Sequence, residues 1–555
     1  MKKIIFLGLF FSISATFFGQ QIPFEILKSA VFQDDVGKST IVLAEKTNEN
    51  NLLIVRSYNN NGLSLEEGFY IEKYDAKLNL LKNFKFKMSH PPSQKYKMVA
   101  GITAFENNIV VVEVFYDSNE KAYICQANTI DANDVVSKKE LFRLSKEEVK
   151  ANGEIALEHD SYVQSKKLFS YDNSGSINSE VDKHNLDFIS FDQKHPLFEE
   201  QDAINIAMVT NESDSAFGII IDFYGEKSEN SKLYLFDSHL NKKIDTEFKR
   251  DIKDDDYLFQ NFQVSPEGYA IYLLAKSYSK DLKQKEKGGK YQFELTKITN
   301  TFQKSLFIDP QEHYINSLKI IFQKKQLICI GFYSDLKETK FQGISYFSFN
   351  PDSLDILNTK YNPFTEQFMT DKYGDKKNNG LKCLTFKKVF FTQNNDLIFN
   401  AEEQYISSSY GNSYGMGSGP YYSYDDIVTA KLNATGDLIW ARNINKNQSA
   451  SNEENMIYLS YTSMLKDDSC YFFINTSDEI KKLRNDRIEF GDVRKNKSNL
   501  NVIRVNANGD FDYKKILDDE QNAVPFMVAK GITLDNTVYF LGRRGKTKQL
   551  LKVTL

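Results

Sequence analysis

Short apolar segments separated by polar turns repeat along almost the whole chain. The clearest example is residues 427–444, IVTAKLNATGDLIWARNI, in which two apolar segments flank a turn containing Asn433 and Gly436. Each repeat also has one nearly continuous apolar segment, which is typical of a strand covered on both faces. These segments are residues 51–58, 108–116, 216–224, 269–278, 326–333, 396–405, 469–477 and 537–545. The pattern predicts repeated units of four antiparallel strands.

Polar turn residues before the fourth strand mark the repeats. They are Asp75, Asp131, Asp192, Asp237, Thr299, Asn350, Asn433 and Asn506. Their spacing of roughly 45 to 80 residues is the scale of propeller blades. The final repeat, residues 526–555, brings the count to nine candidates. The third candidate, residues 154–200, has a poorly formed pattern, so we expect about eight blades, with seven and nine as the alternatives.

The final repeat contains only three strands. Residues 22–32, at the start of the predicted mature chain, could supply the fourth strand and pair with residues 548–555. Such pairing would close the ring and remove open sheet edges. The sequence therefore predicts an all-β fold, a single β-propeller of about eight four-stranded blades closed by its N- and C-terminal strands.

The first twenty residues have the pattern of a signal peptide. Lys2 and Lys3 precede an apolar stretch from Ile4 to Phe18, which is too short for a stable membrane anchor. A buried first strand is the alternative. We expect residues 1–20 to be removed and residues 21–555 to form a propeller without a transmembrane segment. The mature protein would be periplasmic or secreted and associated with the cell surface.

Export implies an oxidising compartment, yet the chain has only four cysteines. Cys125, Cys329, Cys383 and Cys470 each fall within an apolar segment of a different repeat. Buried thiols fit this distribution better than a disulfide framework. We therefore expect all four cysteines to be buried and not to form disulfides.

Composition and motifs narrow the classes of function. Aromatic residues make up 14% of the chain, which favours strands, and the formal charge of -5 comes from interspersed acidic and basic residues. This charge pattern is unlike that of a nucleic-acid-binding protein. Asn506, Asn508 and Asp510 have the spacing of calcium ligands, but Phe511 stands where a calcium loop needs glycine. No motif of a metal site or catalytic triad occurs, and we expect no cofactor.

Two turn sequences resemble a known class of repeats. AKLNATGDLIW (430–440) and VNANGDFDY (505–513) are similar to bacterial secreted β-propeller repeats of the delta-60 and SBBP type. The first is also similar to a repeat of pyrroloquinoline-quinone-binding propellers. Those proteins carry a tryptophan in nearly every blade, whereas Trp440 is the only tryptophan here, which argues against a quinone cofactor. The resemblance implies the propeller architecture.

Insertions collect in the loops between second and third strands and between repeats. In a propeller these loops emerge on one face, which is often the binding face. Residues 407–426 stand out, because five tyrosines alternate with glycine and serine and offer adaptable aromatic contacts. They are Tyr410, Tyr414, Tyr421, Tyr422 and Tyr424. A mobile loop without function is the alternative.

This loop should share a face with residues 282–290 and 481–497, opposite the turns at Asp237, Asn433 and Asn506. The sequence thus favours a non-enzymatic binding or scaffolding propeller that engages a protein or glycan partner at the cell envelope. The alternative is an extracytoplasmic glycan hydrolase or lyase with carboxylates at the channel mouth.

Tyrosine also ends six of the eight nearly continuous apolar segments. These residues are Tyr58, Tyr116, Tyr224, Tyr278, Tyr333 and Tyr405. A tyrosine at a strand end can bury its ring and keep its hydroxyl in water. We expect these side chains to have one shared structural role.

Overall fold

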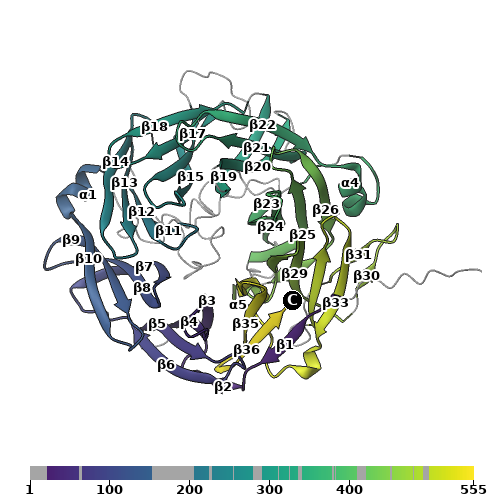
Figure 1. Cartoon of the computed structure of the whole chain (residues 1–555), viewed down its shortest axis with the longest axis horizontal. Helices are drawn as coiled ribbons and strands as arrows, with labels where there is room; N and C mark the ends of the chain where they lie inside the picture. Colours follow the sequence, from purple (N-terminus) through teal and green to yellow (C-terminus); the bar gives the residue numbers. More distant parts are fainter. Residues whose placement is uncertain are drawn as a thin grey trace, which may run out of the picture.

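Eight antiparallel sheets follow one another around a ring (Figure 1). The computed structural model describes residues 22–555 except 62–64, 153–205, 224–227, 254–255, 279–290, 311, 324–325, 336–339, 378–379, 382, 409–419, 451–452, 479 and 492–498. Each sheet contributes four strands in order from the ring centre to its outside, which confirms the predicted all-β propeller with eight blades. The poorly formed candidate repeat, residues 154–200, lies outside the described residues.

The first four blades span residues 39–308. Blade 1 consists of β3 (Ser39–Lys46), β4 (Leu52–Asn61), β5 (Leu65–Tyr74) and β6 (Leu80–Lys87). Blade 2 consists of β7 (Gln94–Phe105), β8 (Asn108–Asp117), β9 (Ala122–Ile130) and β10 (Val136–Ser145), followed by α1 (Lys146–Asn152). Blade 3 consists of β11 (Ile206–Thr210), β12 (Ala216–Phe223), β13 (Glu229–Asp237) and β14 (Lys242–Arg250). Blade 4 consists of β15 (Tyr257–Val264), β16 (Ile271–Tyr278), β17 (Tyr291–Ile298) and β18 (Gln303–Ile308).

The remaining blades carry the additional helices and short strands. Blade 5 consists of β19 (His313–Gln323), β20 (Gln326–Asp335), β21 (Gly343–Phe349) and β22 (Ile356–Pro363), followed by α4 (Glu366–Tyr373). Blade 6 consists of β23 (Leu384–Phe391), β24 (Leu397–Ser408), β25 (Pro420–Leu432) and β26 (Leu438–Ile444), followed by β27 (Gln448–Ala450) and α5 (Glu453–Met456). Blade 7 consists of β28 (Thr462–Lys466), β29 (Ser469–Thr476), β32 (Asn499–Val505) and β33 (Phe511–Leu517), with the hairpin β30 (Lys481–Lys482) and β31 (Ile488–Glu489) inserted. Blade 8 follows the 3-10 turns η3 (Asp519–Gln521) and η4 (Val528–Lys530), and consists of β34 (Ile532–Leu534), β35 (Thr537–Arg544), β36 (Thr547–Thr554) and β1 (Glu25–Lys28).

The N-terminal strand completes the last blade, as the strand count predicted. β1 pairs antiparallel with β36, so that Glu25 lies opposite Thr554 and Lys28 opposite Leu551. β2 (Phe32–Gln33) extends this pairing along the same strand. In Figure 1 the purple β1 lies beside the yellow β36, at the place where the ring closes. The last blade therefore requires residues from both ends of the described chain.

The turns between third and fourth strands share one local structure. In each, a side-chain oxygen accepts hydrogen bonds from backbone N–H groups two and three or four residues later, which is the geometry of an Asx turn or its threonine counterpart. The accepting residues are Asp75, Asp131, Asp237, Thr299, Asn350, Asn433 and Asn506. These seven are the predicted turn residues, and Asp192 lies outside the described residues.

Several of these turns contain one residue with positive φ three or four positions after the first. Leu78, at φ 59°, occupies this place in blade 1, whereas Gly436 and Gly509 occupy it in blades 6 and 7, at φ 85° and 90°. A Cβ on Gly436 would lie 2.2 Å from the ring of Tyr346, in the preceding blade. Glycine is required there because the neighbouring aromatic ring fills the space that leucine uses in blade 1.

The core lies between adjacent blades, where apolar side chains of neighbouring sheets interdigitate. Phe105 of blade 2 packs against Phe217 of blade 3, with ring centroids 6.0 Å apart. None of the four cysteines forms a disulfide, and Cys125, Cys329 and Cys470 are buried as predicted.

Cys383 was wrongly predicted to be buried. It is exposed, at φ 55°, in a bend just before β23. The bend follows an isolated bridge between Phe341 and Leu381 and precedes the first residue of β23. No helix among the described residues is both long and apolar enough to cross a membrane.

Strand alternation gives the ring two different faces. Connections from second to third strands and between blades emerge on one face, which we call the long-loop face. The remaining turns, including those at Asp237, Asn433 and Asn506, emerge on the opposite face, which we call the short-turn face. On the long-loop face, the β30–β31 turn contacts the end of α4, because Asn485 donates a hydrogen bond to Gly374 O at 2.6 Å.

Candidate functional site

Three of the five predicted binding tyrosines lie in a strand rather than in a loop. We predicted a loop over residues 407–426, but β24 continues to Ser408 and β25 begins at Pro420. Tyr421, Tyr422 and Tyr424 therefore belong to β25. The alternation of aromatic and polar residues in PYYSY favours this strand, although the glycine and serine content of the stretch suggested a loop. Tyr410 and Tyr414 lie outside the described residues, as do residues 282–290.

Residues 403–408 and 420–425 form a two-stranded extension of blade 6, which we call the blade 6 hairpin. Tyr405 lies opposite Ser423, and Tyr421 opposite Ser407. Because side chains alternate along a strand, Tyr405 and Tyr421 share one face of the hairpin. Tyr421 is 42% exposed and Tyr405 is 37% exposed. This face presents the exposed aromatic surface of the hairpin.

Tyr422 and Tyr424 belong to the other face of the same hairpin. Both are half-buried, and their backbones pair with Ala450 and Gln448 of β27. The three tyrosines that the structure describes thus do not share one face. Among these three, Tyr421 is exposed, whereas Tyr422 and Tyr424 are half-buried.

The tyrosines that end the second strands show that Tyr405 is exceptional. In blades 1, 2, 4 and 5 they are buried or half-buried and pack on a residue of the third strand. The facing pairs are Tyr58 with Gly68, Tyr116 with Tyr123, Tyr278 with Tyr291 and Tyr333 with Gly343. Tyr405 lies further along its strand, two residues beyond Glu403, the last residue of β24 that pairs with β23. It is exposed, and its hydroxyl donates a hydrogen bond to Asp425 Oδ2 at 2.8 Å. Tyr224 lies outside the described residues.

A cluster of carboxylates forms the base of the blade 6 hairpin. A change of register in β24 and β25 places Glu403 opposite Asp425 and Asp426. The ammonium group of Lys372, in α4, lies 2.7 Å from carboxylate oxygens of both Glu403 and Asp426. Asp426 also accepts a hydrogen bond from Asn443 Nδ2 at 2.9 Å. One lysine therefore serves two carboxylates.

Burial and neighbouring charges shift the pKa values of Glu403 and Lys372 in this cluster. Burial raises the pKa of Glu403 to about 7; Lys372 opposes the shift and the charge of Asp426 adds to it. Burial alone would lower the pKa of Lys372, but the two carboxylates raise it above its ordinary value. Near neutral pH, Glu403 therefore exists in both protonation states while Lys372 keeps its charge.

Helix α4 holds the base of the hairpin in place. The Thr365 side chain caps its N-terminus by accepting a hydrogen bond from Phe368 N, and Gly374 ends it in the left-handed conformation. Asp371 on this helix binds Arg442 of β26, with Nε 2.5 Å from Oδ2. Arg487 of the β30–β31 hairpin donates to Lys372 O at 2.5 Å, near the negative end of the helix dipole. The blade 6 hairpin thus stands on a fixed base.

Sequence reasoning missed Glu403, Asp425 and Lys372. The sequence does carry one usable signal, because the run from Leu397 to Ser408 continues the strand pattern past Tyr405. The contribution of Lys372 has no comparable local signal, since it comes from a helix between two blades.

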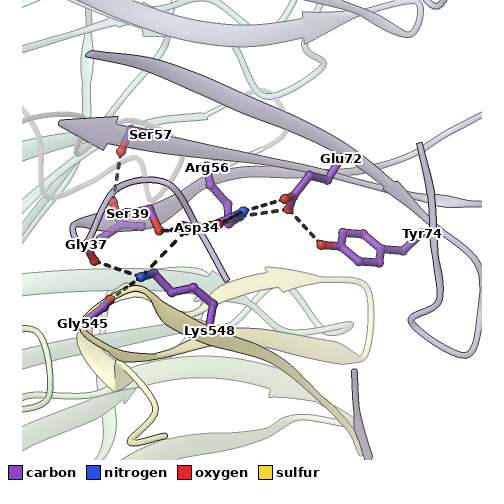
Figure 2. Close-up of polar contacts among 10 residues, drawn as sticks. Asp34, Gly37, Ser39, Arg56, Ser57, Glu72, Tyr74, Gly545 and Lys548 are labelled. Atoms are coloured by element: carbon purple, nitrogen blue, oxygen red, sulfur yellow. Dashed lines mark hydrogen bonds and ion pairs between the residues drawn. The ribbon is translucent and has the colours of Figure 1, made fainter. Parts of the chain in front are cut away.

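A second buried ionic cluster lies where the ring closes (Figure 2). The guanidinium of Arg56, in β4, binds Asp34 through contacts of 2.6 and 3.0 Å. It also binds Glu72 of β5, at 2.9 and 2.5 Å. Lys548 of β36 donates to Gly37 O and Gly545 O at 2.9 and 2.5 Å, and lies 3.8 Å from Asp34.

The charged groups of this second cluster form hydrogen bonds and ion pairs with other residues of the cluster. Ser39 Oγ donates to Asp34, and the Tyr74 hydroxyl donates to Glu72, as Figure 2 shows. Two carboxylates balance two cations, and Arg56 and Lys548 are almost completely buried. Burial lowers the pKa of Lys548 to about 8, although the charge of Asp34 opposes the shift. These contacts link the first and last blades, and we call the cluster of Asp34, Arg56, Glu72 and Lys548 the clasp.

Other charged side chains also pair in the part of the chain that the structure describes, such as buried Lys446 with Glu402 at 2.8 Å. Within those residues, no group of three or more His, Cys, Asp or Glu side chains has a geometry that could hold a metal ion. The blade 6 hairpin combines two exposed aromatic side chains with charged groups.

Comparisons with known proteins assign the chain to no family. No family model matches it, and no curated protein matches it. Solved structures that resemble it include Kuenenia stuttgartiensis hydrazine synthase, at 10% identity and a TM-score of 0.29, covering 60% of this chain and 76% of that one. The Vanderwaltozyma polyspora Nup133 β-propeller domain has 10% identity and a TM-score of 0.31, covering 83% and 94%.

Pyrococcus horikoshii acylaminoacyl peptidase has 7% identity and a TM-score of 0.31, covering 80% of this chain and 58% of that one. Likenesses at this level of identity and TM-score carry no argument about activity.

Proposed function

We propose that this protein is an exported, non-enzymatic binding or scaffolding propeller that engages a protein or glycan partner through the blade 6 hairpin on its long-loop face. The observation that carries the proposal is the exposure of Tyr405. The tyrosines that end the second strands of four other blades are buried or half-buried against their own sheet, whereas Tyr405 lies on the part of β24 that extends past its last pair with β23.

The surroundings of the hairpin support the same proposal. Exposed tyrosines supply large, stiff contact surfaces and often dominate binding interfaces. Lys372 and Arg442 fix α4 to the base of the hairpin. A partner would therefore meet aromatic side chains that are already held in position, which lowers the entropy cost of binding.

The cellular location belongs to the proposal as well. The charged and apolar pattern of residues 1–20 supports export to the periplasm or cell surface. The likeness of residues 430–440 and 505–513 to secreted propeller repeats of the delta-60 and SBBP type supports the same location.

A paired substitution tests the proposal. Tyr405→Ser combined with Tyr421→Ser should abolish capture of the partner from envelope extract while leaving the melting temperature almost unchanged. Tyr513→Ser is the matched control, since Tyr513 is also 42% exposed but lies in the outer strand of blade 7. Equal capture by the double variant and the wild type would refute a role for the hairpin.

One observation favours a second candidate, a glycan hydrolase or lyase. A glycosidase requires one protonated and one ionised carboxyl group. Glu403, with its pKa raised to about 7, lies beside Asp425 and Asp426. If this candidate is right, Glu403→Gln should abolish the release of reducing ends from envelope glycans without reducing their binding.

A further inference from the structure

One edge of the blade 6 hairpin has no pairing strand among the residues that the structure describes. β24 pairs with β25 through Ser408, but on its other side it pairs with β23 only as far as Glu403, opposite Leu384. The next residue, Gln404, donates its N–H to Cys383 O at 2.9 Å. Beyond Gln404, no strand among the described residues pairs with this side of β24.

The backbone groups on this edge can be assigned from the alternation of the strand. Gln404 directs its N–H away from β25, toward Cys383. Because backbone direction alternates with a period of two residues, Ile406 and Ser408 direct their N–H and C=O groups to the same side. The edge therefore offers two donors and two acceptors in the spacing of a β-ladder.

This edge also carries neither the lysine nor the proline that protects many exposed edges. Natural sheets protect exposed edges with lysine, proline or bulges. The outer edge strands of the propeller follow that rule, since β6 carries Lys82, Lys85 and Lys87, and β14 carries Lys242 and Lys243. The segment Tyr405–Ser408, YISS, has no charged residue and no proline.

We propose that an extended peptide segment of a partner protein binds here by adding a strand to the open edge of β24. Main-chain hydrogen bonds supply affinity in this mode of recognition, and alternate side chains supply specificity. The inference rests on the proposed binding function and specifies the form of the partner.

The charges beside the edge define the partner further. Lys372 pairs with the carboxylates of Glu403 and Asp426, whereas Asp425 accepts the hydrogen bond of the Tyr405 hydroxyl. Tyr405 and Tyr421 expose their rings on the same face as Asp425. Carboxylates and aromatic rings together attract cationic side chains, so the added strand carries lysine or arginine on this face. A second copy of the chain would instead bring two negative clusters together.

Hydrogen exchange on the full chain gives the first test. In the protein alone, the amides of Ile406 and Ser408 should exchange rapidly, whereas those of Tyr405 and Ser407, which face β25, should be protected. The probe is the peptide Ac-TVKVKVT-NH2, whose addition should slow exchange at Ile406 and Ser408. Protection of these two amides in the monomer without peptide would overturn the proposal, because the chain itself would then cover the edge. Their protection only in a dimer would overturn it in favour of a second copy.

Matched peptides and variants give the second test. A peptide N-methylated at alternate residues on its pairing side, and one with glutamate in place of lysine, should each bind about tenfold or more weakly than the probe. Ile406→Pro removes one backbone N–H donor from the open edge, and proline is tolerated in edge strands. This variant should bind the probe about tenfold or more weakly than the wild type, whereas Ile406→Val should bind it equally well. Equal binding of the methylated and unmethylated peptides, or no measurable binding of the probe, would overturn strand addition. If Tyr405→Ser with Tyr421→Ser abolishes partner capture but Ile406→Pro does not, the binding function stands and strand addition fails.

Discussion

Asp34 accepts two hydrogen bonds from the guanidinium of Arg56, at 2.6 and 3.0 Å, across the junction where the ring closes. Asp34 belongs to the segment that connects the last blade to the first, and Arg56 belongs to the second strand of blade 1. Closure therefore depends on strand pairing by β1 and on a buried ion pair, both supplied by the N-terminal segment.

Removing Arg56 should destabilise the propeller. Arg56→Met leaves Asp34 and Glu72 buried without their cation, which costs about 3–5 kcal/mol when one partner of a buried pair is lost. Urea unfolding should show this loss. Arg143→Met is the control, since Arg143 also binds two glutamates but is half exposed, and its unfolding midpoint should barely change. Equal midpoints for both variants would contradict the clasp.

Lys548 should make stability depend on alkaline pH. Its pKa is about 8 in the folded protein against an ordinary value of 10.5. Above pH 8 the unfolded chain holds this proton more strongly than the folded one, so the free energy of unfolding should rise with pH between about 8 and 10. Tyrosines that ionise in the unfolded chain oppose this rise above pH 9 to 10 in any variant. The comparison is therefore with Lys548→Met, which should lack the rise, and identical pH profiles would refute it.

Glu403 should make the free energy of unfolding fall, rather than rise, with increasing pH, and in a lower pH range than Lys548. Its pKa is raised from 4.5 to about 7, so its contribution to stability is complete below pH 4.5 and is lost as pH rises through 7. Relative to Glu403→Gln, the wild type should lose about 1–3 kcal/mol of unfolding free energy between pH 4.5 and 7.5. Chemical denaturation across this range measures the difference. A constant difference between the two proteins would show that Lys372 keeps Glu403 ionised throughout.

Gly436 should tolerate no side chain. Gly436→Ala imposes φ 85° on alanine and drives its Cβ into Tyr346, at a cost of about 2–4 kcal/mol. Gly545 is the matched control, because it has φ 58° but a Cβ added there would meet no heavy atom within 4 Å, so Gly545→Ala should cost about 1 kcal/mol. Thermal unfolding that ranks the two variants equally would contradict the packing explanation.

The sequence predicted the features that depend on local chemistry or on counting. The Asx turns at Asp75 and Asn433 depend on residues within five positions of each other. The need for an N-terminal strand in the last blade followed from counting the apolar segments, because the final repeat has only three. Long-range features could not be predicted in this way. Lys548 donates a hydrogen bond to Gly37, which is 511 positions away in the sequence. Cys383 is exposed in a bend that follows the bridge between Phe341 and Leu381.

In the candidate site, too, local features could be predicted from the sequence and long-range features could not. Tyrosine content drew attention to residues 407–426 of blade 6, but the predicted boundary between strand and loop was wrong, because glycine and serine outweighed the alternation in PYYSY. The distinction between Tyr421 and Tyr422 depends on strand register. The role of Lys372 depends on a helix from the preceding connection. Neither relationship is encoded in a local pattern.

Photo-crosslinking from single positions tests the central claim most directly. A photoreactive phenylalanine derivative replaces Tyr421 or Tyr405 on the blade 6 hairpin, or Tyr513 as the equally exposed control, and the full chain is irradiated in cell envelopes. We predict that crosslinking from positions 421 and 405 gives one adduct, in which the mass of a single partner is added to that of the chain, and that position 513 gives none. Adducts from position 513 alone, or none from 421 and 405 in a folded protein, would contradict binding through the blade 6 hairpin.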